Sequence, residues 1–496
     1  MIDERAFTID ADPHGERLPI KLDATSNGEF APVPLDASLR AANALASQWA
    51  ESFARKLNRS RRSFLVSACG AAATLLAFNT AHARAGRSGG FFDVSKDAAL
   101  EPQLAAAELD KKEFIFDVQG HFVNPTGAWT RSLPAGAKPL SGMPKAQCEL
   151  ADKAGERSHL ECLGPDEFIK DVFLDSDTDL MVLSFVPSTR EGEPLTIEEA
   201  LATRDIVDKM EGTHRLMLHG RVNPNQKGDV EDMARLAKLG VVAFKTYTQW
   251  GPDGEGFWMT DDAGLAFVEE ARRVGVRNIC IHKGLPFGQR SYEHSTCRDV
   301  GPIAKRFPDM NFLIYHSGYV AGQEEGPYDP KRTDGIDALV TSLLSAGVKP
   351  NSNVYAELGS TWRFVSMRDP TAAAHALGKL FKYVGTNNVL WGTDSIWYGS
   401  PQDQIQAFRT FQISEELRDA HGYPTMTPEL RAKVFGLNAA KPYNLALTDI
   451  ERTMQGDAVA KGRLAYADRP NPSFATHGPR TRREFLNLRQ WHGTGP

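Results

Sequence analysis

Eight short apolar runs, each followed by a helical stretch, occupy the chain from Lys112 to about Leu447, and this alternation constrains the fold more than any other feature. The runs are rich in β-branched and aromatic residues, as buried strands are. They are FIFDVQGH (114–121), DLMVLSFVP (179–187), HRLMLHGRVNP (214–224), VVAFKTYT (241–248), NICIHK (278–283), NFLIYHSG (311–318), NVYAELGS (353–360) and NVLWGTDS (388–395). Eight strand–helix units favour a closed barrel over an open sheet. The sequence therefore predicts an α/β fold, a (β/α)8 TIM barrel, over residues 112–447.

Side chains that can carry chemistry stand near the ends of six of these runs. They are Gln119 and His121 in the first run, Lys245 in the fourth, His282 in the fifth, His316 in the sixth, Glu357 in the seventh and Asp394 in the eighth. Active sites of TIM barrels lie at the C-terminal ends of the strands. Gln119 and His121 are two residues apart, so both are expected on the same face of their strand, toward the barrel lumen.

Three histidines and an aspartate at four strand ends predict a metal site. Imidazole nitrogens and carboxylate oxygens are the ligands of Zn²⁺ and of similar divalent ions. A lone histidine is more often structural, so the prediction depends on the four groups meeting at one end of the barrel.

The motifs around these residues resemble the amidohydrolase superfamily. Asp117-Val-Gln-Gly-His-Phe-Val-Asn-Pro resembles its D-x-H-x-H-x-x-x-P opening. Ile281-His282, Tyr315-His316, Trp391-Gly-Thr-Asp394 and Lys433-Val-Phe-Gly-Leu-Asn-Ala-Ala resemble the strand 5, strand 6, strand 8 and closing-helix motifs of its amidohydrolase-related branch. That branch includes aminocarboxymuconate-semialdehyde decarboxylase-like enzymes. The resemblance covers about residues 112–447.

The resemblance implies roles for individual residues. His121, His282 and Asp394 would hold one divalent ion, with zinc expected, and His316 would be the catalytic acid or base together with Asp394. Gln119 departs from the pattern because it stands in the place of the first histidine. Its carbonyl is a weaker and harder donor than imidazole. The site is therefore expected to bind metal less tightly, to prefer another ion such as Mn²⁺, or to have lost it.

Five further residues are predicted to line a substrate pocket. Lys245 is expected to supply a substrate-binding ammonium, with a salt bridge at the barrel rim as the other interpretation. Glu357 is expected near the substrate or behind a histidine that it orients. Arg221 and Asn223, after the third run, and Trp250, after the fourth, complete the set.

Three functions remain open at this stage. The first is metal-dependent hydrolysis of a C–O or C–N bond in a small carboxylated or aromatic lactone, ester or amide. The second is non-oxidative decarboxylation of an aromatic or unsaturated acid, which needs the same groups. The third is a periplasmic binding protein without turnover.

The segment before the barrel is predicted to direct export. Ser60-Arg-Arg-Ser-Phe-Leu, a run of small apolar residues and Ala81-His-Ala resemble a twin-arginine signal over 60–83, cleaved after Ala83. The predicted partner is then the twin-arginine translocase, and the predicted location is the periplasm. Residues 1–59 would be a disordered extension, apart from one short amphipathic helix, and 84–111 a linker. The other interpretation of 60–83 is a buried alanine-rich helix.

Net charge, the cysteines and the C-terminal residues add further predictions. A net charge of −6 gives no basic excess for nucleic acid. The substrate is expected to be a small molecule, and a homodimer is an open interpretation. The insertion 126–165 is long for a loop and carries Cys148 and Cys162, which could pair in an oxidising compartment. Residues 448–496 are expected to be a loosely ordered basic tail.

Overall fold

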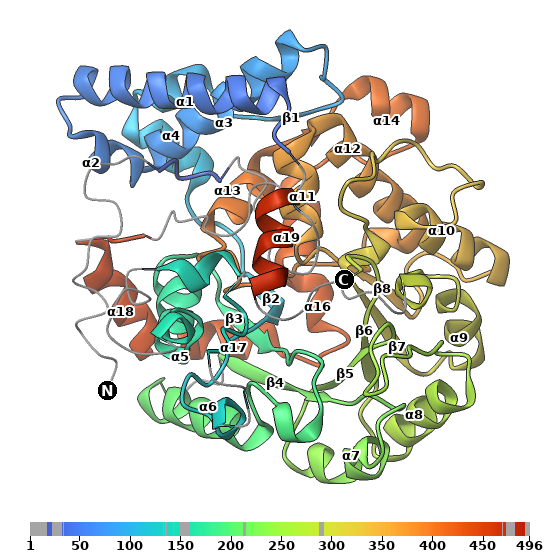
Figure 1. Cartoon of the computed structure of the whole chain (residues 1–496). Helices are drawn as coiled ribbons and strands as arrows, with labels where there is room; N and C mark the ends of the chain where they lie inside the picture. Colours follow the sequence, from blue (N-terminus) through green and yellow to red (C-terminus); the bar gives the residue numbers. More distant parts are fainter. Residues whose placement is uncertain are drawn as a thin grey trace.

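The computed structural model shows a barrel, with further helices formed by the chain before it and after it (Figure 1). It describes residues 17–21, 32, 34–131, 133, 136–141, 143–148, 158–211, 215–286, 292–468, 470–472 and 482–491. Within these residues no helix is both long enough and apolar enough to cross a membrane.

The barrel consists of eight parallel strands that neighbour one another in chain order. They are β2 (Phe116–Gly120), β3 (Leu180–Leu183), β4 (Leu216–Arg221), β5 (Ala243–Tyr247), β6 (Asn278–His282), β7 (Asn311–Tyr315), β8 (Val354–Glu357) and β9 (Val389–Leu390). The last strand returns to the first, since Val118 N–H donates to Trp391 O at 3.0 Å. A bridge between Gly120 and Ser395 extends this closure. The predicted (β/α)8 barrel is confirmed.

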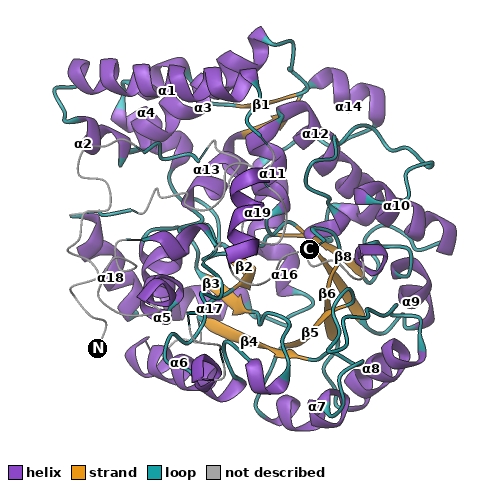
Figure 2. Cartoon of the chain, in the orientation of Figure 1, coloured by secondary structure: helices purple, strands orange, loops and turns teal. Residues whose placement is uncertain are grey.

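Helices surround the strands (Figure 2). They are α5 (Pro165–Ile169), α6 (Ile197–Glu211), α7 (Asp229–Lys238), α8 (Asp262–Arg273), α9 (Val300–Arg306), α10 (Gly335–Ala346), α11 (Thr361–Arg368), α12 (Pro370–Lys379), α13 (Gln402–Thr410), α14 (Glu415–His421), α15 (Pro428–Ala432) and α16 (Asn438–Ala440). In α8 the buried residues are Gly264, Phe267, Val268 and Ala271. Their spacing of three, four and seven gives one apolar stripe, which is why this helix lies against the barrel.

A helical layer precedes the barrel in the chain, where the sequence predicted a disordered extension and a linker. It contains α1 (Ala37–Lys56), α2 (Arg61–Leu65), α3 (Ala68–Arg84), β1 (Gly90–Phe92) and α4 (Pro102–Leu109). The helix α1 corresponds to the one amphipathic helix that the sequence allowed within 1–59. Asp36 caps it, and it buries an alanine stripe that includes Ala42, Ala46 and Ala50. The linker prediction is wrong, since β1 and α4 are regular elements.

The helix α3 spans most of the predicted signal and is buried in the main hydrophobic core. The side-chain amide of Asn79 donates to Phe92 O at 2.7 Å and accepts from Phe92 N–H at 2.9 Å. The Phe78 ring lies 5.2 Å from the Phe92 ring, centroid to centroid. The 60–83 segment is therefore an integral part of the described fold, as in the other interpretation of its sequence. Its cleavage as a signal stays an untested prediction.

A two-stranded antiparallel sheet joins this layer to the barrel domain. Strand β1 pairs with β10 (Phe411–Ile413), with Gly90 opposite Ile413. The Phe92 and Phe411 rings are 5.7 Å apart, and Phe411 in turn lies 5.2 Å from the ring of Trp362 in α11. This aromatic chain makes the layer and the barrel share one core.

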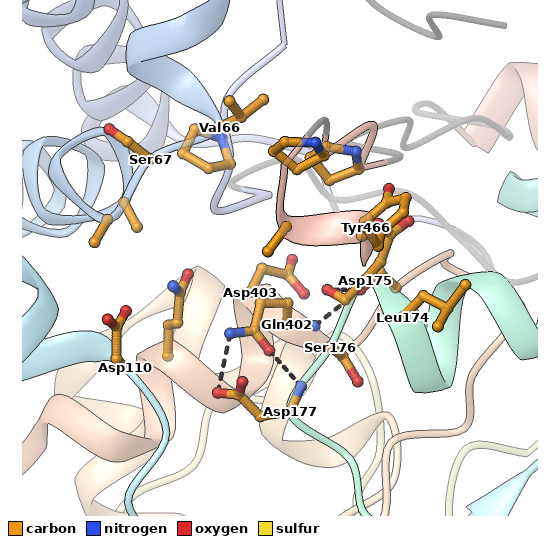
Figure 3. A pocket seen from close by; sticks show the side chains of 18 of the residues that line it. Val66, Ser67, Asp110, Leu174, Asp175, Ser176, Asp177, Gln402, Asp403 and Tyr466 are labelled. Carbon is orange, nitrogen blue, oxygen red and sulfur yellow. Dashed lines mark hydrogen bonds between the residues drawn. The ribbon is translucent and has the colours of Figure 1, made fainter. Parts of the chain in front are cut away.

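A cavity of about 340 Å³ separates the α2–α3 turn from the outside of the barrel (Figure 3). Val66 and Ser67 face it from the layer, Asp175–Asp177 face it from the loop before β3, and Gln402 faces it from the start of α13. None of the residues predicted for the active site lines this cavity. One of its walls would be lost if the chain were cut after Ala83.

The described part of the C-terminal segment is largely helical, which corrects the expectation of a loose tail for these residues. It contains α17 (Leu447–Met454), α18 (Ala458–Ala467) and α19 (Arg482–Trp491). Arg215, just before β4, donates to both carboxylate oxygens of Asp457, at 2.5 and 3.0 Å. Met454 packs on the core inside the barrel. This part of the tail therefore closes the end of the barrel at which the strands begin.

The insertion after β2 carries a disulfide between Cys148 and Cys162, as one predicted pairing had it. Beside it lies a separate apolar cluster that includes Trp129, Met143, Leu160 and Trp397. Part of the insertion, including 149–157, lies outside the described residues. The described part lies over the mouth of the barrel through Trp397, which follows β9.

Candidate active site

Gln119, His121 and Asp394 form one cluster at the C-terminal end of the barrel. Asp394 Oδ1 lies 3.0 Å from Gln119 Nε2 and 3.1 Å from His121 Nε2. The two nitrogens are 3.4 Å apart. Backbone hydrogen bonds fix this arrangement, since Asp394 N–H donates to Gln119 O at 3.0 Å. Barrel closure between the first and last strands is thus what brings these groups together.

The second carboxylate oxygen of Asp394 is held by a serine that the sequence did not single out. Ser360 Oγ donates to Asp394 Oδ2 at 2.6 Å and lies 3.3 Å from the Tyr398 hydroxyl. Burial tends to raise the pKa of Asp394, but the hydrogen bond to His121 and the charges of His121 and His316 lower it to about 2. The carboxylate is therefore ionised near neutral pH.

His316 and His282 form a second pair. His316 Nε2 lies 3.2 Å from His282 Nδ1, and His316 Nδ1 lies 2.7 Å from the carbonyl oxygen of Gly359. A carbonyl only accepts, so Nδ1 carries the proton of neutral His316 and Nε2 keeps its lone pair. Burial lowers the pKa of His316 to about 4 and that of His282 well below its usual value. Both rings are therefore neutral near pH 7.

Glu357 orients the His316 backbone. Its carboxylate accepts from His316 N–H at 3.0 Å and from Gly359 N–H at 2.5 Å. Burial raises the pKa of Glu357 to about 8. A Cβ at Gly392 would lie 1.6 Å from Glu357 Oε1, which explains the glycine of the Trp-Gly-Thr-Asp motif. Glu357 thus positions the loop that carries the histidine, as one of its two predicted roles requires.

Four residues at this site have left-handed backbone conformations without being glycine. Their φ values are +65° for His316, +53° for Ser317, +54° for Ser360 and +61° for Asp394. Such conformations cost about 1–3 kcal/mol each and persist where the surrounding structure imposes them. Their concentration at one place is typical of a functional site.

Lys245 lies inside the barrel below the histidines. Its Nζ is 3.6 Å from the centroid of the Tyr315 ring and 4.8 Å from that of Tyr247. Its charge contributes to the lowered pKa of both His282 and His316. The structure therefore places this ammonium within electrostatic reach of the site.

Arg221 and Trp250, which were also predicted for the pocket, have different surroundings. Arg221 donates to Glu193 Oε1 at 2.8 Å and to Asp229 Oδ2 at 2.9 Å. Trp250 is partly exposed, and its carbonyl accepts from Asn225 at 2.9 Å. The described contacts of these two residues are with loops, and their substrate role stays a prediction.

The site is closed from solvent by an aromatic residue. Trp397 stacks on His121 with the rings 5.1 Å apart and belongs to the apolar cluster beside the disulfide. His121, His282, His316 and Asp394 are all at most 2% exposed. The reactive side chains therefore lie below the surface of the barrel mouth.

The donors of the first cluster fit a metal ion. Metal–ligand bonds of about 2.0–2.2 Å place neighbouring donors about 3.0–3.5 Å apart, which matches the distances within the cluster. Turning the Gln119 amide over puts its oxygen in the place of Nε2. In the present orientation Gln119 Oε1 is buried without a hydrogen-bond partner among the described residues.

The predicted ligand set is only partly assembled. In the described part of the chain no three His, Cys, Asp or Glu side chains are arranged to hold one ion. His121 and Asp394 supply two donors, and Gln119 is the third group beside them. His282 contacts His316, so its role as a ligand stays a prediction.

Sequence reasoning missed Ser360, Tyr398 and Trp397. Trp397 and Tyr398 follow Asp394 by three and four residues, and Ser360 follows Glu357 by three. Proximity to the strand-end residues was the available signal, but serine and aromatic residues are too common in loops for it to be specific.

A family model described as "Amidohydrolase" matches residues 116–445. The chain therefore belongs to this amidohydrolase family. Among curated proteins none matches the chain.

Solved structures with a similar fold include several barrels. A 5-carboxyvanillate decarboxylase from Novosphingobium aromaticivorans, with manganese and a nitrobenzoic acid, is 16% identical, with TM-score 0.42 and coverage of 68% of this chain and 97% of its own. A 2,6-dihydroxybenzoate decarboxylase from Rhizobium is 14% identical, with TM-score 0.39 and coverage of 67% and 99%. A probable 2-pyrone-4,6-dicarboxylic acid hydrolase from Acinetobacter baumannii, with citric acid, is 13% identical, with TM-score 0.40 and coverage of 67% and 99%. Such identities and TM-scores carry no argument about the reaction of this chain.

Proposed function

We propose that the chain is a hydrolase that cleaves a C–O or C–N bond in a small carboxylated or aromatic lactone, ester or amide. The observation that carries this proposal is the His316 ring, whose Nδ1–H donates to Gly359 O and whose Nε2, 3.2 Å from His282 Nδ1, keeps the lone pair that takes a proton. Family membership supports an enzyme. A general base must be in its unprotonated form at the working pH. The lowered pKa of His316 meets this requirement.

In this proposal His316 moves the proton and Asp394 has an orienting role. His316 Nε2 accepts the proton of the attacking water and passes it to the leaving group. Asp394 is ionised and held by Ser360, and it orients Gln119 and His121 through its other carboxylate oxygen. Trp397 over His121 excludes bulk water, which strengthens these electrostatic interactions.

One divalent ion, with zinc or manganese as candidates, is proposed at His121, Asp394 and the Gln119 carbonyl, with His282 as a further ligand. The chemistry supplied by such an ion is Lewis-acid polarisation of a substrate oxygen. Two oxygen donors beside two imidazoles favour a harder ion than a site with three histidines does.

The test combines metal analysis with a substrate panel. Purified full chain is assayed for bound metal and incubated with lactones, esters, amides and aromatic acids. Acid release that is lost in His316→Asn supports hydrolysis. Release of CO₂ in its place would assign the carboxy-lyase alternative. Binding without any turnover would assign the non-catalytic alternative.

Export to the periplasm through the twin-arginine translocase also remains a proposal. The Cys148–Cys162 disulfide supports it, because disulfides persist in oxidising compartments. The burial of α3 argues against cleavage after Ala83. The mass of the chain recovered from a periplasmic fraction tests location and cleavage together.

A further inference from the structure

Three buried polar side chains at the mouth of the barrel have polar atoms without partners. Ser184 follows β3, Asn223 follows β4 and Gln249 follows β5, and they are 1%, 0% and 6% exposed. The Ser184 hydroxyl and both polar atoms of each amide have no hydrogen-bond partner among the described residues. Buried polar groups are nearly always hydrogen-bonded, and leaving them unpaired is unfavourable. The described residues therefore leave these atoms able to hydrogen-bond to a ligand.

Strand register places Asn223 at the height of the catalytic histidines. Arg221 lies opposite Lys245 in β5, so Asn223, two residues further on, is level with Tyr247. Tyr247 in turn lies opposite His282 in β6, and their rings stack at 5.1 Å.

Side-chain alternation places Asn223 toward the lumen. In β4, which ends two residues before Asn223, His219 faces the barrel interior, where it lies 3.3 Å from the Tyr315 hydroxyl and 3.6 Å from Cys280 Sγ. Residues that are two apart share a face. Asn223, four residues after His219, is therefore on the inner side, at the mouth.

Asparagines with structural roles in this protein look different. Asn278, 3% exposed at the start of β6, donates to Pro442 O at 2.8 Å and accepts from Asn311 Nδ2 at 2.9 Å. Asn388, also 3% exposed, donates to two backbone carbonyls. Asn223 is as deeply buried, yet its amide is not used in the fold.

We propose that Asn223, with Ser184 and Gln249, binds a carboxylate of the substrate on the β3–β5 side of the mouth. The reacting bond then lies toward Asp394 and His316 on the β7–β9 side. Amide and hydroxyl N–H and O–H groups donate to carboxylate oxygens, and the buried ammonium of Lys245 on β5 adds a favourable charge. This inference rests on the proposed function and narrows its substrate to a small carboxylic acid.

The first experiment needs no substrate. Asn223→Ala removes an amide that the fold does not use, so its Tm is expected to stay within about 1 °C of wild type. Asn278→Ala is the matched control, and it is expected to lower Tm by at least about 2 °C because it breaks hydrogen bonds. A loss of Tm in Asn223→Ala equal to that in Asn278→Ala would overturn the inference.

The second experiment uses benzoate and 2-hydroxybenzoate as probes, with binding measured by calorimetry on the full chain. Asn223→Ala is expected to weaken binding at least 10-fold, and Asn223→Asp to weaken it further, because a carboxylate repels the probe. If Asn223→Ala binds the probes as tightly as wild type, the inference is wrong. If wild type binds them with this dependence on Asn223 but turns over no member of the substrate panel, the inference stands and the proposed hydrolysis fails.

Discussion

The barrel and the helical layer before it are both packed into one core, but their sequences look very different. The barrel alternates strand and helix patterns, and each pattern has its own periodicity. The layer contains ACGAAATLLAF, a run of small apolar residues after two arginines. An export signal and a tightly packed buried helix both require such a run. The comparison shows that periodicity identifies an element, whereas apolar composition alone does not tell what surrounds it.

The sharpest way to break this comparison is to delete residues 1–83. We expect the shortened chain not to unfold cooperatively, since the deletion strips α1–α3 from Phe92, β1 and β10. The loss should exceed the total stability of a typical domain, about 5–15 kcal/mol. Circular dichroism during thermal unfolding measures it against the full chain. A shortened chain with wild-type Tm would show that the segment is a dispensable leader.

A single substitution tests the same packing more gently. Phe78→Ala is expected to lower the free energy of unfolding by about 3–5 kcal/mol, because a fully buried ring leaves a cavity. Phe91→Ala is the control, since Phe91 is 40% exposed, and it should change stability by less than about 0.5 kcal/mol. Chemical denaturation of both variants gives the values. Equal losses in the two would mean that α3 is not packed as described.

Substitutions in the barrel site should change activity, whereas substitutions in the helical layer should change stability. Ser360→Ala removes the donor to Asp394 Oδ2 and is expected to lower kcat/KM about 10- to 100-fold, as loss of an orienting hydrogen bond does. Ser366→Ala, in α11 six residues after Ser360, removes a hydroxyl that makes no described hydrogen bond to Asp394. It should change kcat/KM less than twofold. Activity on the substrate found in the panel measures both variants, and equal effects would argue against a positioning role for Ser360.

The smallest expected effect is a change in the pH dependence of stability that His82 in the helical layer causes. Burial lowers the pKa of His82 to about 4, below its value in an unfolded chain. The unfolded state therefore binds a proton more readily, and stability falls as pH drops from about 6.5 toward 4. His82→Leu should reduce the loss between pH 7 and pH 5 by about 1–2 kcal/mol. Urea unfolding at the two pH values measures this. An unchanged pH dependence would show that His82 is not buried in solution.

The barrel and most of its site residues could be predicted because each strand carries its own signal. Gln119, His121, His282, His316 and Asp394 stand at strand ends, and parallel strands of a barrel end on one side. The sequence could not show how these residues pair. The contact of His282 with His316, and of Asp394 with Gln119, depends on side-chain directions that follow from closure and loop conformation. Ser360 was missed because its role depends on a left-handed backbone at that residue.

By itself, the sequence determined the barrel, the order of its strands and the side of it that holds the chemistry, since these follow from local periodicity and from chain direction. Only the tertiary structure decided that α3 lies in the core, that the tail closes the barrel and that the Asn223 amide has no partner in the described fold. Each of these depends on contacts between segments far apart in the chain. The free energy of burial depends on what covers a side chain, and the residue type alone does not contain that information.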